Sequence, residues 1–134
     1  MADDLNSAGA DLYWYPIGFS DAATLEMGKQ YGVFIDQSKF STVRRMKSAI
    51  AHEIGHCATG CTHKVSSPLD LIEKHEYEAN RWKIEHYLPF EVLNDAIKHG
   101  YVEPWALADY FDVPEEDIIM AVRYYINRRG MKFG

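Results

Sequence analysis

The stretch STVRRMKSAIAHEIGHCATG, residues 41–60, decides the fold because it reads as one long, well-delimited helix. It contains no proline, it opens with Ser41, a good N-cap residue, and it ends at Gly60. Apolar and small side chains recur around it at helical spacing: Val43, Met46, Ala49, Ile50, Ala51, Ile54, Gly55, Cys57 and Ala58. We therefore predict a helix from Ser41 to about Thr59 that is covered nearly all round, as a central helix is.

This helix contains His52-Glu53-Ile54-Gly55-His56, in which two histidines are four residues apart. Around a helix axis the two imidazoles lie about 40° apart and one turn apart, so both can reach one metal ion. Glu53 lies just beside them, where a base can take a proton from water activated by the ion. The pattern predicts a zinc site with His52 and His56 as ligands and Glu53 as catalytic base, the alternative being a chance match of ordinary helix histidines.

A second helix is predicted from Ser67-Pro68 to about Leu88, because proline suits a first helical turn and Pro89 ends the run. Its inward stripe consists of Leu69, Ile72, Glu76, Ala79, Asn80, Lys83 and Tyr87. A carboxylate on such a stripe is costly to bury unless it is neutralised, for example by a cation. Glu76 is therefore predicted as the third metal ligand. Asn80, one turn later, is predicted to hold a metal-binding histidine by its other ring nitrogen.

Three other glutamates on the same predicted helix compete with Glu76 for this role: Glu73, Glu78 and Glu85. At about 100° per residue they are rotated from Glu76 by about 60°, 200° and 180° respectively. Glu76 is the one that shares a face with Asn80, so the stripe favours it as the ligand.

The chain before these helices reads as β and the chain after them as α. Strands are expected at Leu12–Ile17, Ala22–Met27 and Gln30–Asp36, with a turn at Gly28-Lys29, and shorter helices at about Phe90–Lys98, Pro104–Phe111 and Pro114–Arg128. The predicted fold class is α+β, a small three-stranded antiparallel sheet followed by about five helices. Its 134 residues suit a single domain, 1–134, with 1–36 mainly strands, 41–88 the two metal-site helices and 89–134 the C-terminal helices.

Composition narrows the function classes. The net charge of −6 does not favour direct nucleic-acid binding, and no apolar stretch is long enough to span a membrane. Asp3 and Asp4 stand where a signal peptide would have basic residues, so we expect a cytoplasmic protein. Cys57 and Cys61 make no disulfide framework; buried or ordinary thiols are favoured over a redox pair or a competing metal site.

The motifs together resemble the ImmA/IrrE family of zinc metallopeptidases. The residues that carry the resemblance are His52-Glu53-Ile54-Gly55-His56, Glu76-Tyr77-Glu78-Ala79-Asn80, Trp82 and Leu88-Pro89. It runs from about Tyr31 to Phe111, and the segment from Trp105 to Pro114 is also similar to the family's C-terminal end. The resemblance implies a zincin-like fold, with one Zn²⁺ per chain held by His52, His56 and Glu76, and Glu53 as base.

Members of the family are encoded largely by phages, integrative elements and their bacterial hosts, and typically cleave a helix-turn-helix repressor to derepress genes. The resemblance therefore implies a protein substrate, expected to bind extended along an edge of the small sheet. A non-hydrolytic zinc-containing regulator that binds a repressor or DNA is the alternative. Candidates to stabilise the oxyanion of the transition state stay open: His63, His75, His86, His99, Tyr77 and Tyr87.

Overall fold

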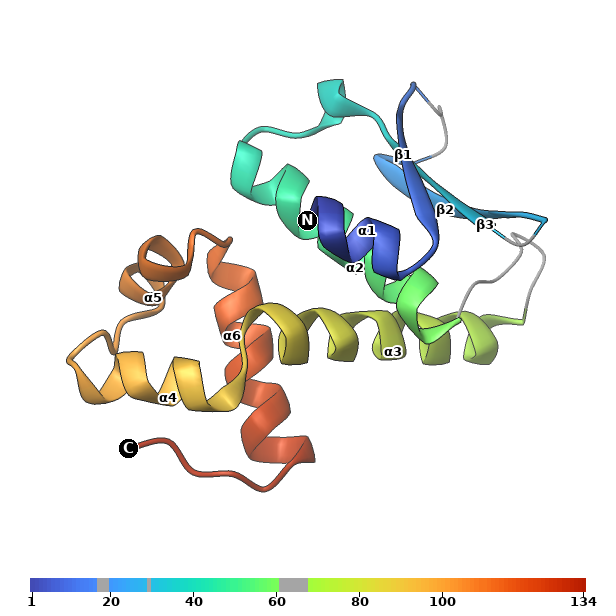
Figure 1. Ribbon diagram of the computed structural model, residues 1–134. Helices are drawn as coiled ribbons and strands as arrows, with labels where there is room; N and C mark the ends of the chain where they lie inside the picture. Colours follow the sequence, from blue (N-terminus) through green and yellow to red (C-terminus); the bar gives the residue numbers. More distant parts are fainter. Residues whose placement is uncertain (17–19, 29, 61–67) are drawn as a thin grey trace. The chain divides into compact units, whose positions relative to one another are not determined.

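The computed structural model describes residues 1–16, 20–28, 30–60 and 68–134, which form two compact units, Met1–Lys83 and Ile84–Gly134. The fold is α+β, as predicted, with a three-stranded sheet and six α-helices within the described residues (Figure 1). Among those residues, no helix combines the length and the apolar character that crossing a membrane requires.

The sheet is mixed rather than antiparallel, so that part of the prediction is wrong. Its strands are β1 (Ala10–Trp14), β2 (Ala22–Met27) and β3 (Gln30–Ile35), in the order β1-β3-β2. The pair β2 and β3 is antiparallel, as expected, whereas β1 and β3 are parallel. Trp14 and Ala22 both lie beside Ile35. After β1 the chain therefore crosses to the other edge of the sheet and forms β2 there. The third strand, β3, then lies between β1 and β2.

The N-terminal segment departs from the prediction in two further ways. A short helix that was not predicted, α1 (Ala2–Ser7), precedes the first strand. Asp3 and Asp4 lie in its first turn, where acidic side chains interact favourably with the helix dipole. The first strand, β1, ends at Trp14 rather than at Ile17, which lies outside the described residues together with Lys29 of the predicted turn. The second predicted strand, Ala22–Met27, is confirmed.

The central helix α2 spans Val43–Thr59 and ends at Gly60 in the left-handed conformation (φ 67°), as predicted. Its N-cap is Thr42 rather than Ser41. The Thr42 backbone is extended, and its hydroxyl accepts a hydrogen bond from the Arg45 N–H at 3.2 Å. The sequence offers two adjacent hydroxyl residues, and backbone conformation selects the second as the cap.

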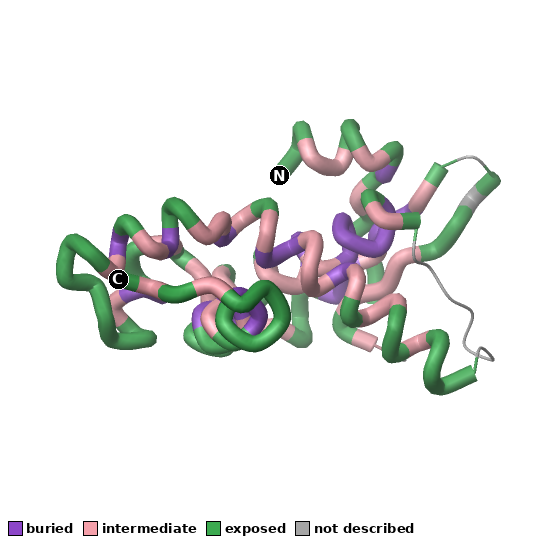
Figure 2. The backbone as a smooth tube through the Cα atoms, turned by 90° about the horizontal axis from the view of Figure 1, so that it is seen from below, coloured by how far each residue is buried: buried purple, intermediate pink, exposed green. Residues whose placement is uncertain are grey.

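The core of the first unit lies between α2, α1 and one face of the sheet. Figure 2 marks its buried residues in purple, and they are Ala10, Val33, Ile35, Ile50, Ile54 and Cys57. Val43 and Ala58 are exposed. We predicted that α2 would be buried on nearly all sides. Its buried residues are limited to the stretch from Ile50 to Cys57, which contains the histidine motif.

The remaining elements follow the predicted pattern closely. After the 3₁₀ turn η1 (Gln37–Lys39) and α2 come α3 (Leu69–Tyr87), α4 (Phe90–Lys98), α5 (Pro104–Phe111), α6 (Glu115–Arg123) and the π-helix η2 (Tyr124–Arg128). The predicted helix 114–128 is thus divided into α6 and η2, and Pro114 is its N-cap residue. Ser67 lies outside the described residues, and Pro68 precedes the first residue of α3.

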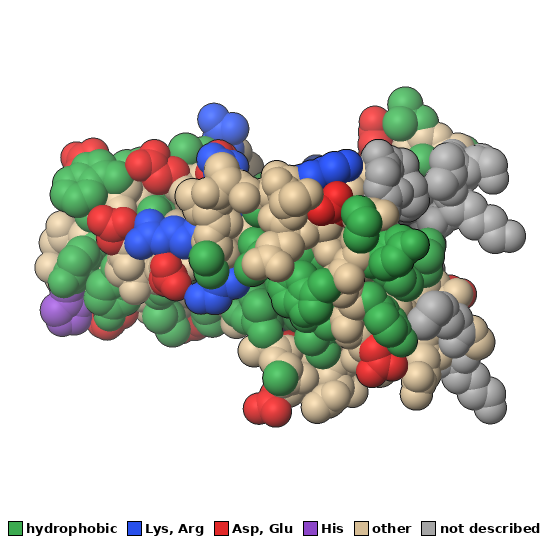
Figure 3. Space-filling model, turned by 90° about the horizontal axis from the view of Figure 1, so that it is seen from above, with side chains coloured by type: hydrophobic (Ala, Val, Ile, Leu, Met, Phe, Trp, Pro, Cys, Tyr) green, Lys and Arg blue, Asp and Glu red, His purple; other side chains and the backbone are tan. Residues whose placement is uncertain are grey.

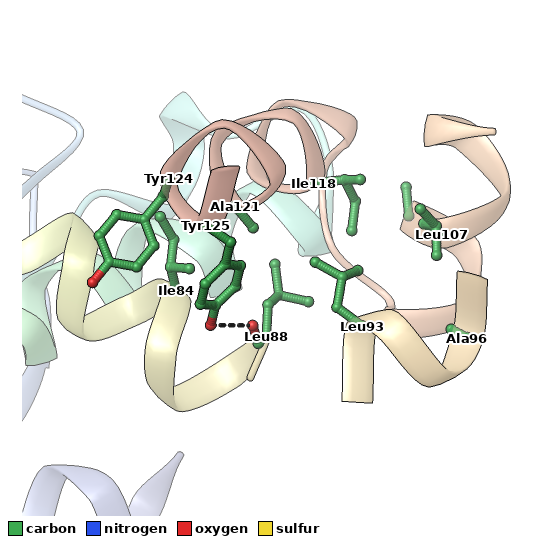
Figure 4. Packing of buried hydrophobic residues seen from close by; sticks show 10 residues of the cluster. Ile84, Leu88, Leu93, Ala96, Leu107, Ile118, Ala121, Tyr124 and Tyr125 are labelled. Carbon is green, nitrogen blue, oxygen red and sulfur yellow. Dashed lines mark hydrogen bonds between the residues drawn. The ribbon is translucent and has the colours of Figure 1, made fainter. Parts of the chain in front are cut away.

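The second unit has its own apolar core, built from the end of α3 and from α4, α5, α6 and η2. Figure 4 shows its buried side chains: Ile84, Leu88, Leu93, Ala96, Leu107, Ala108, Ile118, Ala121, Tyr124 and Tyr125. Tyr125 donates its hydroxyl proton to the Leu88 carbonyl oxygen at 2.8 Å, so its polar end is satisfied inside the core.

We predict that Tyr125→Phe lowers the free energy of unfolding by about 1–2 kcal/mol, because the Leu88 carbonyl loses its buried donor. Burial raises the pKa of Tyr125 to about 12. The neutral phenol is thus favoured in the folded protein, and its stabilisation is lost as the pH rises from about 10 towards 12. Urea unfolding at neutral and alkaline pH should show the two proteins converging; equal stability at neutral pH would contradict this.

Candidate metal centre

The close packing of α2 on α3 begins at Gly55. A Cβ atom at this position would lie 2.5 Å from the Ala79 carbonyl oxygen of α3, so no larger residue fits without moving the backbone. A second contact across the same pair of helices is the buried Lys83, whose Nζ donates to the Ser48 hydroxyl at 3.1 Å. Gly55, the residue just before His56, thus allows α3 to approach α2 closely.

This packing brings His52, His56 and Glu76 together. The Nε2 atom of His52 lies 2.6 Å from Glu76 Oε2, and the Nε2 atom of His56 lies 3.0 Å from Glu76 Oε1. The two imidazole rings are nearly perpendicular, with centroids 4.8 Å apart. The potential ligand atoms of all three residues lie within 4.8 Å of one another, so the group could hold a metal ion.

Asn80 contacts the other side of His52, as the stripe predicted. Its Oδ1 lies 2.7 Å from His52 Nδ1 and can accept a hydrogen bond only if that nitrogen carries a proton. In the neutral imidazole, this leaves a lone pair on Nε2 facing a carboxylate oxygen at 2.6 Å. Two lone pairs at that distance require a cation between or beside them, a proton or a metal ion. The geometry of His52 therefore suits a cation site.

Glu76 carries the negative charge of this group. Hydrogen bonds from His52 and then His56 hold the pKa of its carboxyl well below the usual range, so it stays ionised. The His56 side chain is 5% exposed, whereas that of Glu76 is 43% exposed. The group is thus anchored in the core on the side of α2 and open to solvent on the side of α3.

The competing glutamates of α3 are engaged elsewhere or exposed. Glu78 accepts from Arg81 at 2.6 Å, and Glu85 accepts from Arg129 at 3.0 Å. Glu73 is exposed. Among the described residues, Glu76 is the glutamate of α3 that joins the two histidines in a potential metal-binding group.

Glu53 is buried beside the two histidines, with a side chain that reaches β2. Its Oε1 accepts a hydrogen bond from the Thr24 hydroxyl at 3.0 Å, and that hydroxyl is 3.3 Å from the Glu53 carbonyl oxygen. Burial raises the pKa of Glu53, while His52, His56 and Thr24 act in the opposite direction. Thr24 could not be identified from the sequence, because nothing local distinguishes this strand threonine from others.

Of the remaining candidates, Cys61 and His63 lie outside the described residues. Cys57 is buried, as predicted, and burial raises its pKa to about 11, so the thiol keeps its proton. His99 contacts the Asp95 carbonyl within its own helix, and His86 packs edge-on against Tyr87. The choice of an oxyanion-stabilising residue stays open.

Comparison of the chain with protein-family models, with curated proteins and with solved structures found no match. The ImmA/IrrE resemblance therefore rests on the residues quoted from the sequence.

We predict that Gly55→Ala destabilises the protein by about 1–3 kcal/mol, because the added methyl group collides with the Ala79 carbonyl. In a helix without this contact, alanine would stabilise the protein by about 1 kcal/mol relative to glycine. A measured destabilisation would therefore come from the packing of α2 on α3. Thermal unfolding and metal titration should show a loss of stability and of affinity together. The exposed Ala58, replaced by Leu, is the control on the same helix, and a more stable Gly55→Ala protein would contradict the prediction.

The ligand assignment predicts that Glu76→Ala lowers zinc affinity by more than about 100-fold, beyond the loss typical of an outer hydrogen-bond partner. Glu73→Ala, which changes an exposed carboxylate on the same helix, should leave the affinity unchanged. Competition with a chromogenic chelator measures both. Equal zinc affinity in the two variants would remove Glu76 from the ligand set.

Proposed function

We propose that this protein is a zinc-dependent endopeptidase of the ImmA/IrrE type, with a zincin-like fold. The observation that carries the proposal is the convergence of two imidazole nitrogens and one carboxylate on α2 and α3, with the buried carboxylate of Glu53 beside them. The substrate that we propose is a helix-turn-helix repressor of a phage or mobile element, cleaved in the cytoplasm to derepress its genes.

Zinc is the metal that this donor set fits best. Two imidazole nitrogens and one carboxylate oxygen are a common catalytic zinc set, and three protein ligands leave a position for water or substrate. A zinc ion held there would polarise the scissile carbonyl and lower the pKa of water. The partial exposure of the Glu76 side chain supports access from solvent.

Glu53 acts as the general base and acid in this proposal. Its carboxylate takes a proton from the attacking water and later gives it to the nitrogen of the leaving amine, so that the peptide C–N bond breaks and the carboxylate is restored. Burial raises its pKa above the ordinary value. A base whose pKa lies nearer the working pH both accepts and returns the proton more readily.

The outer edge of β2 is the proposed docking site for an extended peptide. Asp36 donates its backbone N–H to the Asp21 carbonyl, and hydrogen-bonded pairs alternate along an antiparallel ladder. The backbone groups of Ala22, Thr24 and Glu26 therefore point away from β3. The N–H and C=O of Ala22 already bond to the Ser20 hydroxyl. Within the described residues β2 is an outer strand, so the backbone groups of Thr24, in its middle, can pair with a peptide.

A protein partner agrees better with the charge than nucleic acid does. The chain carries a net charge of −6, and α6 begins with three acidic residues, Glu115, Glu116 and Asp117. Figure 3 shows one face of the molecule on which hydrophobic side chains lie among acidic and basic ones. Trp14 at the end of β1 and Tyr15 directly after it are exposed apolar residues. Such a surface is better suited to a polypeptide than to phosphates.

The proposal predicts that Glu53→Gln keeps zinc and fold but slows cleavage at least about 100-fold, because the base is lost and the ligands are not. The measurement is zinc-dependent cleavage of a candidate helix-turn-helix repressor, chosen among those whose genes neighbour that of this chain, followed by gel and mass spectrometry. Zinc content and circular dichroism establish that the variant is intact.

The matched control is Glu73→Gln, an exposed glutamate outside the group, which should cleave normally. If Glu53→Gln still derepresses the target genes as the unchanged protein does, hydrolysis is not the activity. The non-hydrolytic regulator, which binds a repressor or DNA, would then be the better description.

A further inference from the structure

We propose that Thr24 is a positioning residue for Glu53, which it holds by one carboxylate oxygen so that the other is left to receive the proton. The inference rests on the proposed function, since it assigns Glu53 the role of base. It adds a residue from the sheet to a site whose other members lie on the two helices.

The contact joins two elements that are distant in the sequence. The Thr24 hydroxyl lies 3.0 Å from Glu53 Oε1, between residues 29 positions apart. Glu53 is only 7% exposed, and within the described part of the chain Thr24 is the hydrogen-bond donor recorded for its carboxylate. A hydrogen bond from a hydroxyl to a carboxylate is among the stronger ones.

Orientation is what this bond supplies. A glutamate side chain has three rotatable bonds, and a buried carboxylate without a fixed partner can adopt more than one rotamer. A displacement of about 1 Å at a reacting group can reduce a rate by about 100-fold. By fixing Oε1, the Thr24 hydroxyl limits the carboxylate to one placement beside His52 and His56.

Thr24 also occupies the middle of the proposed docking edge. Its side chain contacts α2, while its backbone N–H and C=O point to the outer edge of β2, as derived above from the strand register. One residue thus contacts the base through its side chain and would contact an extended peptide through its main chain. This arrangement fixes the position of the peptide along the strand relative to Glu53.

The test compares Thr24→Val, which keeps the shape and removes the hydroxyl, with Thr24→Ser, which keeps the hydroxyl. The probe is acetohydroxamate, a small zinc chelator that can also hydrogen-bond to the base, titrated calorimetrically into each zinc-loaded protein. Thr24→Val should weaken its binding about 10-fold, as expected for a lost hydrogen bond to a charged group, and Thr24→Ser should bind within about 3-fold of the unchanged protein. Zinc affinity should be the same in all three.

A double-mutant cycle separates positioning from a structural role. If Thr24 acts through Glu53, then adding Thr24→Val to Glu53→Gln should change acetohydroxamate binding no further. Leu25→Ala, on the next residue of β2 and exposed, is the control for damage to the strand. If Thr24→Val does not fold, Thr24→Ala takes its place in the cycle.

For the proposed substrate, Thr24→Val should lower kcat about 10–100-fold and leave KM unchanged. Additive effects in the cycle, or acetohydroxamate binding by Thr24→Val equal to that of the unchanged protein, would overturn the inference, as would an unchanged protein that binds no zinc. An unchanged protein that shows the expected cycle but cleaves no repressor would remove the proposed substrate and leave the role of Thr24 intact.

Discussion

The candidate centre depends on one close approach, that of the α3 backbone to Gly55 of α2. Because the position has no Cβ atom, the Ala79 carbonyl can come within a distance that any side chain would prevent. Glu76 lies almost one turn before Ala79, and Asn80 directly follows Ala79. The same close approach therefore brings Glu76 and Asn80 into contact with the histidines. A small residue between the two histidines is therefore as much a part of the candidate centre as the three potential ligands are.

Around this approach the charges compensate one another. The carboxylate of Glu76 lies against two imidazoles, Asn80 orients one of them, and Glu53 is held by Thr24. A buried carboxylate without partners is costly, and each polar group here has one. The core that supports the site on the other side of α2 is apolar, with Val33, Ile35 and Ile54 fully buried. The helix thus has a polar side that carries the potential metal-binding group and an apolar side that packs in the core.

The sequence predicted what depends on local periodicity and missed what depends on distant partners. Counting around two helices was enough to choose Glu76 and Asn80, and prolines and glycines marked the ends of α3, α4 and α5. The parallel pairing of β1 with β3 could not be predicted, because the residues of a strand do not by themselves specify its neighbour in the sheet. The contact of Thr24 with Glu53, 29 residues apart, was missed for the same reason.

The outer edge of β2 also bears on how the protein behaves at high concentration. Unpaired main-chain groups on a sheet edge can pair with the same edge of another molecule, which leads to aggregation. Proteins limit this with charged side chains and short edge strands. Here β2 has six residues, and Glu26 near its end carries a charge. A peptide-docking edge of the kind proposed for β2 cannot be fully protected, so the solubility of this protein and its binding of the proposed peptide would depend on the same short strand.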